Sequence, residues 1–122
     1  MKEIPNSYNW FIKLNLKNFV PWNFKDDLDF FTSFNSQFKK ECPKREVLTF
    51  ANRQDMDTFA GFEILDGKTT EKIVVFHLTF NNNSDWNIIE AEYEDLFEFL
   101  RKSVLPTMKE WILDDDIEDY EN

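Results

Sequence analysis

Residues 47–80 read VLTFANRQDMDTFAGFEILDGKTTEKIVVFHLTF, and this stretch decides the fold. It holds three apolar runs rich in β-branched and aromatic residues, Val47–Ala51, Thr58–Leu65 and Lys72–Phe80, with two short polar connections between them. The second connection opens with Asp66-Gly67, and glycine accepts the positive φ that tight hairpin turns require. We therefore predict an antiparallel meander of three strands. The third run is apolar at successive positions, so we expect helices on both faces of the sheet.

The segments before the meander have the spacing of helices. An apolar stripe that begins at Tyr8 predicts a helix ending near Lys17. A second stripe, Phe31, Phe34 and Phe38, predicts a core-facing helix, because residues at these intervals share one helical face.

The segment after the meander predicts a long helix from about Glu92, with apolar residues at helical spacing over two dozen residues. Pro106 lies inside this pattern, so a kink or a break into two helices is expected there. Residues 86–89 either add a short strand or pack inward. The predicted fold class is α+β, with an antiparallel meander of three to four strands packed by N-terminal helices and this C-terminal helix.

Length and composition are those of one compact domain. The chain has 122 residues, of which 42% are hydrophobic and 17% aromatic, which is enough apolar material for a substantial core. We expect a single domain over residues 1–113, followed by an acidic tail over 114–122. With no apolar run of signal-peptide or membrane-spanning length, the chain is expected to be cytoplasmic, without a membrane partner.

Negative charge is concentrated at one end of the chain. The formal net charge is −10, and residues 90–122 carry 12 acidic but only 3 basic side chains, whereas residues 1–89 carry 12 and 11. Such a field repels phosphate backbones, so a nucleic-acid partner is not expected. It attracts a basic protein instead, although acidic faces also serve simply to keep a phenylalanine-rich protein soluble.

Residues for catalysis are sparse. Cys42 is the only cysteine and His77 the only histidine, and nucleophilic catalysis needs an activated nucleophile beside a base. We expect His77 to be a core or rim residue held by a hydrogen bond. The acids around the first hairpin could suggest a metal site, but the turn itself explains Asp66-Gly67. No catalytic residue, metal or cofactor is therefore expected. In the 52–57 connection, Arg53 is expected to pair with Asp55 or Asp57, either in an ordered hairpin loop or in a recognition loop.

Several short motifs resemble one known family. Ile4-Pro5-Asn6-Ser7-Tyr8-Asn9-Trp10-Phe11-Ile12 resembles the Leu/Ile-Pro-x-x-Tyr-x-x-Phe-Leu helix entry of the SMI1/KNR4 (SUKH) superfamily. Pro21-Trp22 and the stretch Leu48–Phe62 are similar to a later family motif. Val74–Leu78 and Leu96–Leu100 are similar to its last blocks. The Gly-Gly that follows the helix entry in many members is missing here.

The resemblance implies an α+β fold and a role without catalysis. Bacterial members are typically immunity proteins that bind and neutralise a cognate toxin, often a nuclease. The expected function is therefore an immunity protein that binds a basic, nuclease-type toxin through an acidic surface. The alternative is a general protein-interaction or scaffold module of the same type without a toxin partner. The candidate contacts are acids of the last helix and the tail, with the 52–57 loop as a second patch: Glu90, Glu92, Glu94, Asp95, Glu98, Asp114, Asp115, Asp116, Glu118, Asp119, Arg53, Asp55 and Asp57.

Overall fold

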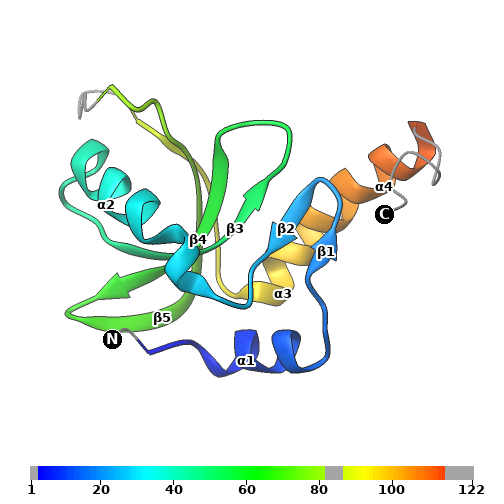
Figure 1. Cartoon of the computed structure of the whole chain (residues 1–122), viewed down its shortest axis with the longest axis horizontal. Helices are drawn as coiled ribbons and strands as arrows, with labels where there is room; N and C mark the ends of the chain where they lie inside the picture. Colours follow the sequence, from blue (N-terminus) through cyan, green and yellow to red (C-terminus); the bar gives the residue numbers. More distant parts are fainter. Residues whose placement is uncertain (1–2, 82–86, 115–122) are drawn as a thin grey trace.

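The described part of the chain forms one antiparallel sheet with helices on both faces (Figure 1). The computed structural model describes residues 3–81 and 87–114. Within them the sheet has six strands, and their spatial order follows the sequence: β1 (Asn18–Phe19), β2 (Trp22–Phe24), β3 (Val47–Arg53), β4 (Thr58–Leu65), β5 (Lys68–His77) and β6 (Ile89–Tyr93). The helical segments are α1 (Asn6–Lys13), η1 (Leu28–Phe31), α2 (Thr32–Glu41), α3 (Leu96–Phe99), η2 (Leu100–Val104) and α4 (Leu105–Asp114).

The predicted meander corresponds to β3, β4 and β5, and its antiparallel pairing is confirmed. Asp66 and Gly67 connect β4 to β5 with φ values of 52° and 77°, as in the two-residue hairpin turns that match strand twist. Leu65 and Lys68, on either side of the turn, are paired. The predicted count of three to four strands is too low, because β1 and β2 extend the sheet beyond β3 and β6 extends it beyond β5.

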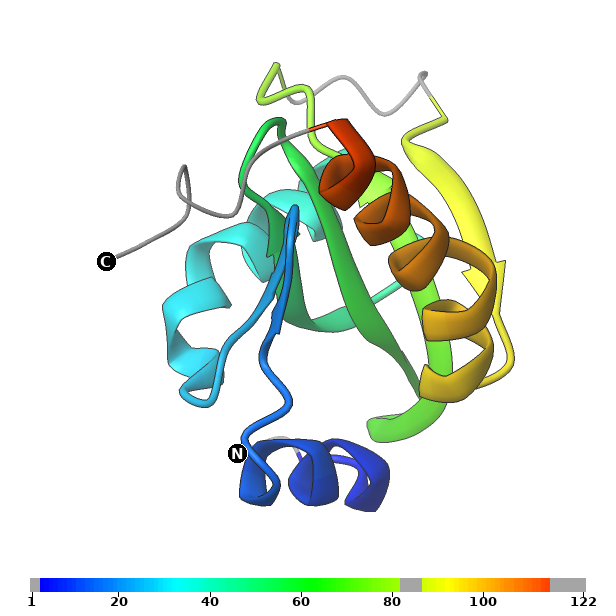
Figure 2. The ribbon, with the colours of Figure 1, turned by 90° about the vertical axis from the view of Figure 1, so that its right-hand side faces the viewer.

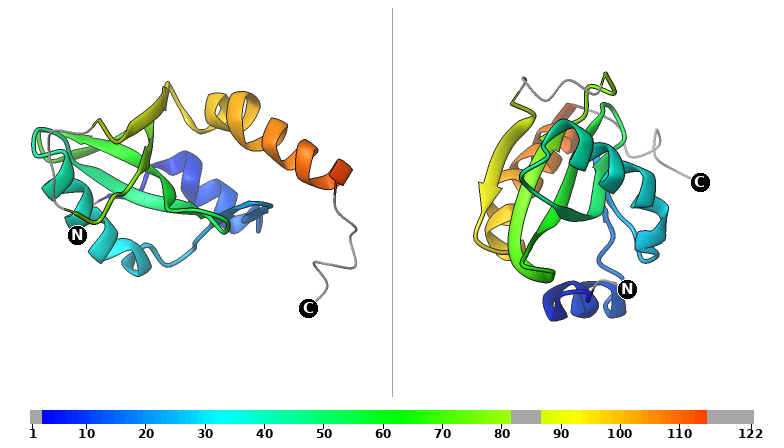
Figure 3. Two further views of the ribbon diagram at one scale, coloured as in Figure 1. Left: turned by 90° about the horizontal axis from the view of Figure 1, so that it is seen from above. Right: turned by 90° about the vertical axis from the view of Figure 1, so that its left-hand side faces the viewer.

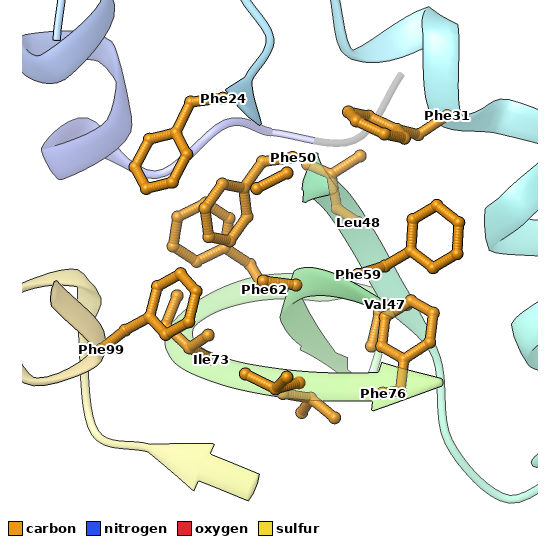
Figure 4. Packing of buried hydrophobic residues seen from close by; sticks show 14 of the residues in the cluster. Phe24, Phe31, Val47, Leu48, Phe50, Phe59, Phe62, Ile73, Phe76 and Phe99 are labelled. Carbon is orange, nitrogen blue, oxygen red and sulfur yellow. The ribbon is translucent and has the colours of Figure 1, made fainter. Parts of the chain in front are cut away.

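Aromatic side chains fill both faces of the sheet. Figures 1 and 2 show η1 and α2 on one side of the strands and α3 on the other. In Figure 4, Phe24, Phe50, Phe62 and Phe99 gather on one side of the strands, whereas Phe31, Phe59 and Phe76 lie on the other. The expected cover on each face of the meander is confirmed.

Tyr8 fixes α1 against the first of these two clusters. Its ring centroid lies 5.1 Å from that of Phe50 and 5.8 Å from that of Phe62. Its hydroxyl donates hydrogen bonds to the carbonyl oxygens of Lys25 and Phe50. Burial raises the pKa of Tyr8 well above its usual range, as does the charge of Asp26.

The helix boundaries differ from those expected at both ends of the chain. The first helix ends at Lys13, not near Lys17. The last begins at Leu96, not near Glu92, because residues 89–93 pair with β5. The Phe31–Phe38 stripe is confirmed as part of the core, with Phe31 and Phe38 buried and Phe34 partly buried.

Pro106 does not interrupt the C-terminal helix. Instead α3 passes into η2, a π-helical turn over Leu100–Val104, and then into α4. Proline has no N–H, so Pro106 cannot donate the bond that an α-helical residue would give to the carbonyl of Lys102. The carbonyl group of Lys102 lies within the π-helical turn. The expected break into two helices is therefore wrong: the helix is continuous and changes type just before Pro106.

The last part of this helix lies largely outside the core. Val104 is buried, whereas α4 contains no buried residue and leaves Ile112 and Leu113 exposed. Figure 3 shows α4 extending past the end of the sheet. Among the described residues, no helix is long and apolar enough to cross a membrane.

Candidate protein-binding site

Glu92, one of the expected contact residues, takes part in a network of ion pairs within the domain. It is not on the last helix but on β6, the strand at one edge of the sheet. Its Oε1 lies 2.6 Å from Arg45 Nη2 and 3.0 Å from Lys72 Nζ, and Arg45 Nε lies 2.8 Å from Glu63 Oε2. The hydrogen bonds from Arg45 and Lys72 lower the pKa of Glu92 to about 2. Its charge is therefore balanced inside the molecule.

Asp95 and Glu98 also have internal partners. Asp95 Oδ1 accepts a hydrogen bond of 2.9 Å from the backbone N–H of Glu98 and so caps α3. The carboxylate of Glu98 pairs with Arg101 at 2.9 Å and with Lys102 at 3.2 Å, and these contacts lower its pKa. Both acids stabilise the helix on which they lie.

The loop between β3 and β4 contains the expected pair of charges. Arg53 donates two hydrogen bonds of 2.9 Å to Asp55, which confirms the expected pairing. The backbone N–H of Gln54 donates to the carbonyl of Pro21 at 2.9 Å and ties the loop to the β1–β2 turn. The loop is held from two sides and its Arg53–Asp55 pair is electrically neutral.

Four of the expected acids remain unpaired. Within residues 3–81 and 87–114, no basic side chain pairs with Asp57, Glu90, Glu94 or Asp114. The four come from separate parts of the chain, because Asp57 is the last residue of the β3–β4 loop, Glu90 is on β6, Glu94 follows β6 and Asp114 ends α4. Four other expected acids, Asp115, Asp116, Glu118 and Asp119, lie outside the described residues.

Asp57 and Glu90 line the same hollow, which we call the acidic hollow. It has a volume of about 520 Å³ and is lined by Asp57, His77, Leu78, Thr79, Asn81, Asn87, Ile88 and Glu90. Leu78 and Ile88 are buried and provide an apolar floor. His77 is exposed, and its Nδ1 lies 3.3 Å from Thr58 Oγ1, so the expected hydrogen-bonded rim position is confirmed. Two acids far apart in the sequence thus line one hollow, together with two buried apolar residues.

A second hollow, the aromatic hollow, adjoins the first. Its volume is about 500 Å³ and its lining consists of Phe30, Phe34, Asn52, Arg53, Gln54, Asp55, Met56, Asp57 and Phe59. Asp57 lines both hollows. Phe30 and Met56 are 57% and 45% exposed, so the lining of this hollow offers apolar surface to a partner.

A buried carboxylate, which the sequence did not suggest, fixes the chain between the two hollows. Glu41 is only 1% exposed and accepts hydrogen bonds from the backbone N–H groups of Thr79 at 2.9 Å and Phe80 at 3.0 Å, and from Gln37 Nε2 at 2.8 Å. Burial acts to raise the pKa of Glu41, but the hydrogen bonds outweigh it and the pKa is lowered. Phe80 has a φ of 62°, which bulky residues rarely adopt. The Glu41 contacts hold it there.

Neither a group of metal ligands nor a comparison with known proteins identifies the function of these hollows. Within the described residues, no group of three or more His, Cys, Asp or Glu side chains could hold a metal ion. No family model, curated protein or solved structure matches the chain.

Proposed function

We propose that this chain is a non-catalytic protein-binding domain whose partner is a basic protein, and that it acts as an immunity protein neutralising a nuclease-type toxin. The observation that carries the proposal is the acidic hollow, where Asp57 and Glu90 face a common space without a basic partner among the described residues. That the partner is a toxin is implied by the resemblance of the sequence to the SMI1/KNR4 (SUKH) superfamily.

The chemistry of the hollow favours a cationic protein group over other partners. A carboxylate removed from water needs a compensating charge or hydrogen bonds, which a lysine or arginine of a partner provides. The apolar floor at Leu78 and Ile88 adds surface for the aliphatic part of such a side chain. The net charge of −10 accelerates the approach of a basic protein and disfavours nucleic acid.

The first step of the test is to search the genes beside the one that encodes this chain for a basic, nuclease-type protein, here called the neighbouring basic protein; the absence of such a gene would count against the immunity function. Binding is measured by calorimetry for the wild type, for Asp57→Asn/Glu90→Gln and for Glu3→Gln/Asp66→Asn. The control pair removes the same charge from exposed positions elsewhere, Glu3 before α1 and Asp66 in the β4–β5 turn. We expect the first pair to weaken binding at least about tenfold and the control to change it about twofold, since close charge pairs contribute more than remote ones.

Salt dependence and protection of cells complete the test. Raising the salt concentration should slow association, because exposed charges are then screened. Co-expression of the chain should protect cells from the neighbouring protein. Equal affinity of both double variants, or an association rate that does not change with salt, would contradict the proposal. Binding without any effect on toxicity would favour the general interaction module over the immunity protein.

A further inference from the structure

We propose that the aromatic hollow receives an arginine side chain of the basic partner, with its guanidinium stacked on Phe34 and paired with Asp57. This inference rests on the proposed function and adds to it the residue that anchors the partner and the place where it binds. The acidic hollow would then be one half of a larger binding surface, with the β3–β4 loop between the two halves.

The aromatic rings form a continuous group, in which the buried Phe59 and the partly buried Phe34 lie beside the exposed Phe30 and Phe80. The centroid of Phe34 lies 4.7 Å from that of Phe59, 6.4 Å from that of Phe30 and 6.5 Å from that of Phe80. Phe30 and Phe80 are 57% and 48% exposed. Apolar groups of this kind rimmed by polar residues mark protein-interaction sites.

The charges around these rings favour a cation. Asp57 is unpaired among the described residues, whereas Arg53 is satisfied by two hydrogen bonds to Asp55. The ammonium of Lys25 already lies over the ring of Phe30, 5.0 Å from its centroid. Within the described residues no cation lies over Phe34, and we therefore assign the partner's cation to that ring. Arginine suits the site better than lysine, because its planar guanidinium stacks on a ring and binds a carboxylate through two hydrogen bonds.

The hollow is built from parts that are held in place. The Arg53–Asp55 pair and the bond from Gln54 to Pro21 hold the loop. On the other side, Glu41 holds the backbone of Phe80, whose ring packs edge-on against Phe34. Glu41 is thus a positioning residue for the aromatic wall. A site formed before binding avoids the entropic cost of ordering its residues.

The first test uses the unmodified chain and needs no variant. The 15N-labelled full chain is titrated with the peptide acetyl-Gly-Arg-Gly-Arg-Gly-amide, and the titration is repeated with citrulline in place of both arginines. Citrulline keeps the shape of arginine without its charge. We expect amide shifts of residues 52–59 with the arginine peptide and shifts at least about threefold smaller with citrulline. Equal shifts from the two peptides, or shifts confined to other parts of the chain, would overturn the inference.

The second test uses the neighbouring basic protein and the variants Phe34→Leu and Phe97→Leu. Leucine keeps apolar volume but removes the ring, and Phe97 is a control because it is 62% exposed on α3. We expect Phe34→Leu to weaken binding about three- to fivefold and Phe97→Leu to leave it unchanged. If Asp57→Asn/Glu90→Gln weakens binding but Phe34→Leu does not, the inference fails and the proposed function stands. If none of these variants weakens binding, both fail.

Discussion

Glu90 and Glu92 lie two residues apart on the same edge strand and line a common hollow with Arg45, yet only Glu92 is paired with basic side chains. Glu92 contacts Arg45 and Lys72 and belongs to a network that also includes Glu63. Glu90 has no basic partner among the described residues and lines the acidic hollow. An excess of acidic residues in a sequence therefore includes two kinds of acid, those paired with a base inside the molecule and those without such a partner. Only the unpaired kind is available to a partner without first breaking an internal contact.

The network around Glu92 depends on the register of the sheet. Val47 pairs with Glu63 across β3 and β4, and Val74 pairs with Glu92 across β5 and β6. These registers bring Arg45, just before β3, close to both acids. Substitutions at Arg45, Asp95 and Glu92 test how far acids with internal partners differ from Glu90.

Arg45→Ala should have the largest effect, a loss of about 2–3 kcal/mol in the free energy of unfolding at neutral pH. The change removes the closest base from Glu63, whose side chain is only 7% exposed. Urea denaturation measures the loss. Arg53→Ala is the matched control, because its pair with Asp55 is local and the acid left behind is 26% exposed, against 7% for Glu63, and it should cost less than about 1 kcal/mol. Equal losses for the two variants would mean that the network around Glu92 has no special structural role.

Asp95→Ala should lower the free energy of unfolding by about 1 kcal/mol, because α3 loses the side chain that caps its N-terminus. Asp95→Asn keeps an acceptor and should recover most of this stability while removing the charge. Urea denaturation of both variants separates capping from charge. A loss of the same size for asparagine would show that the negative charge of Asp95, not its hydrogen bond, stabilises the helix.

Glu92→Gln should make stability less dependent on acid pH. The pKa of Glu92 is about 2 in the folded chain, against an ordinary 4.5. A lowered pKa stabilises the folded state above the ordinary value and ceases to do so as pH falls from about 5 towards 2. The side chain is 37% exposed, so solvent screening limits the effect to about 1 kcal/mol.

The measurement is the difference in unfolding free energy between wild type and variant at pH 7, 5, 4 and 3. For Glu92→Gln this difference should shrink below pH 5. For Glu90→Gln it should stay within about 0.5 kcal/mol throughout, as for an exposed residue without partners. A pH-dependent difference for Glu90→Gln of the same size would remove the distinction between the two acids.

Sequence patterns predicted the centre of the fold because its signals are local. The Asp66-Gly67 turn and the apolar runs beside it are contained in one stretch, and the phenylalanine stripe of α2 repeats within a few turns. Strands β1 and β2 have two and three residues, too few for a recognisable alternation. The residues of β6, Ile89-Glu90-Ala91-Glu92-Tyr93, do alternate. A short strand at residues 86–89 is one of the two expectations for this segment, and β6 begins at the last of these residues and continues to Tyr93. The helical spacing that follows overlaps this alternation from Glu92 onward.

Prediction of contacts succeeded for the Arg53–Asp55 pair, which lies within a single loop. It failed where contacts join distant segments. The pairing of Glu92 requires the register of the whole sheet, and Glu41 sits in the last turn of α2, at a polar position that gives no sign of burial. Its partners, Thr79 and Phe80, are 38 and 39 residues away.

The order of the strands in the sheet affects how the chain folds. Within the described residues, every strand pairs only with strands that precede or follow it directly in the sequence. The cost of loop closure rises with the length of chain that separates two contacts, and folds rich in local contacts form faster. The β4–β5 hairpin, with its two-residue turn, is the shortest step. We expect it to form early and the other strands to add outward from it.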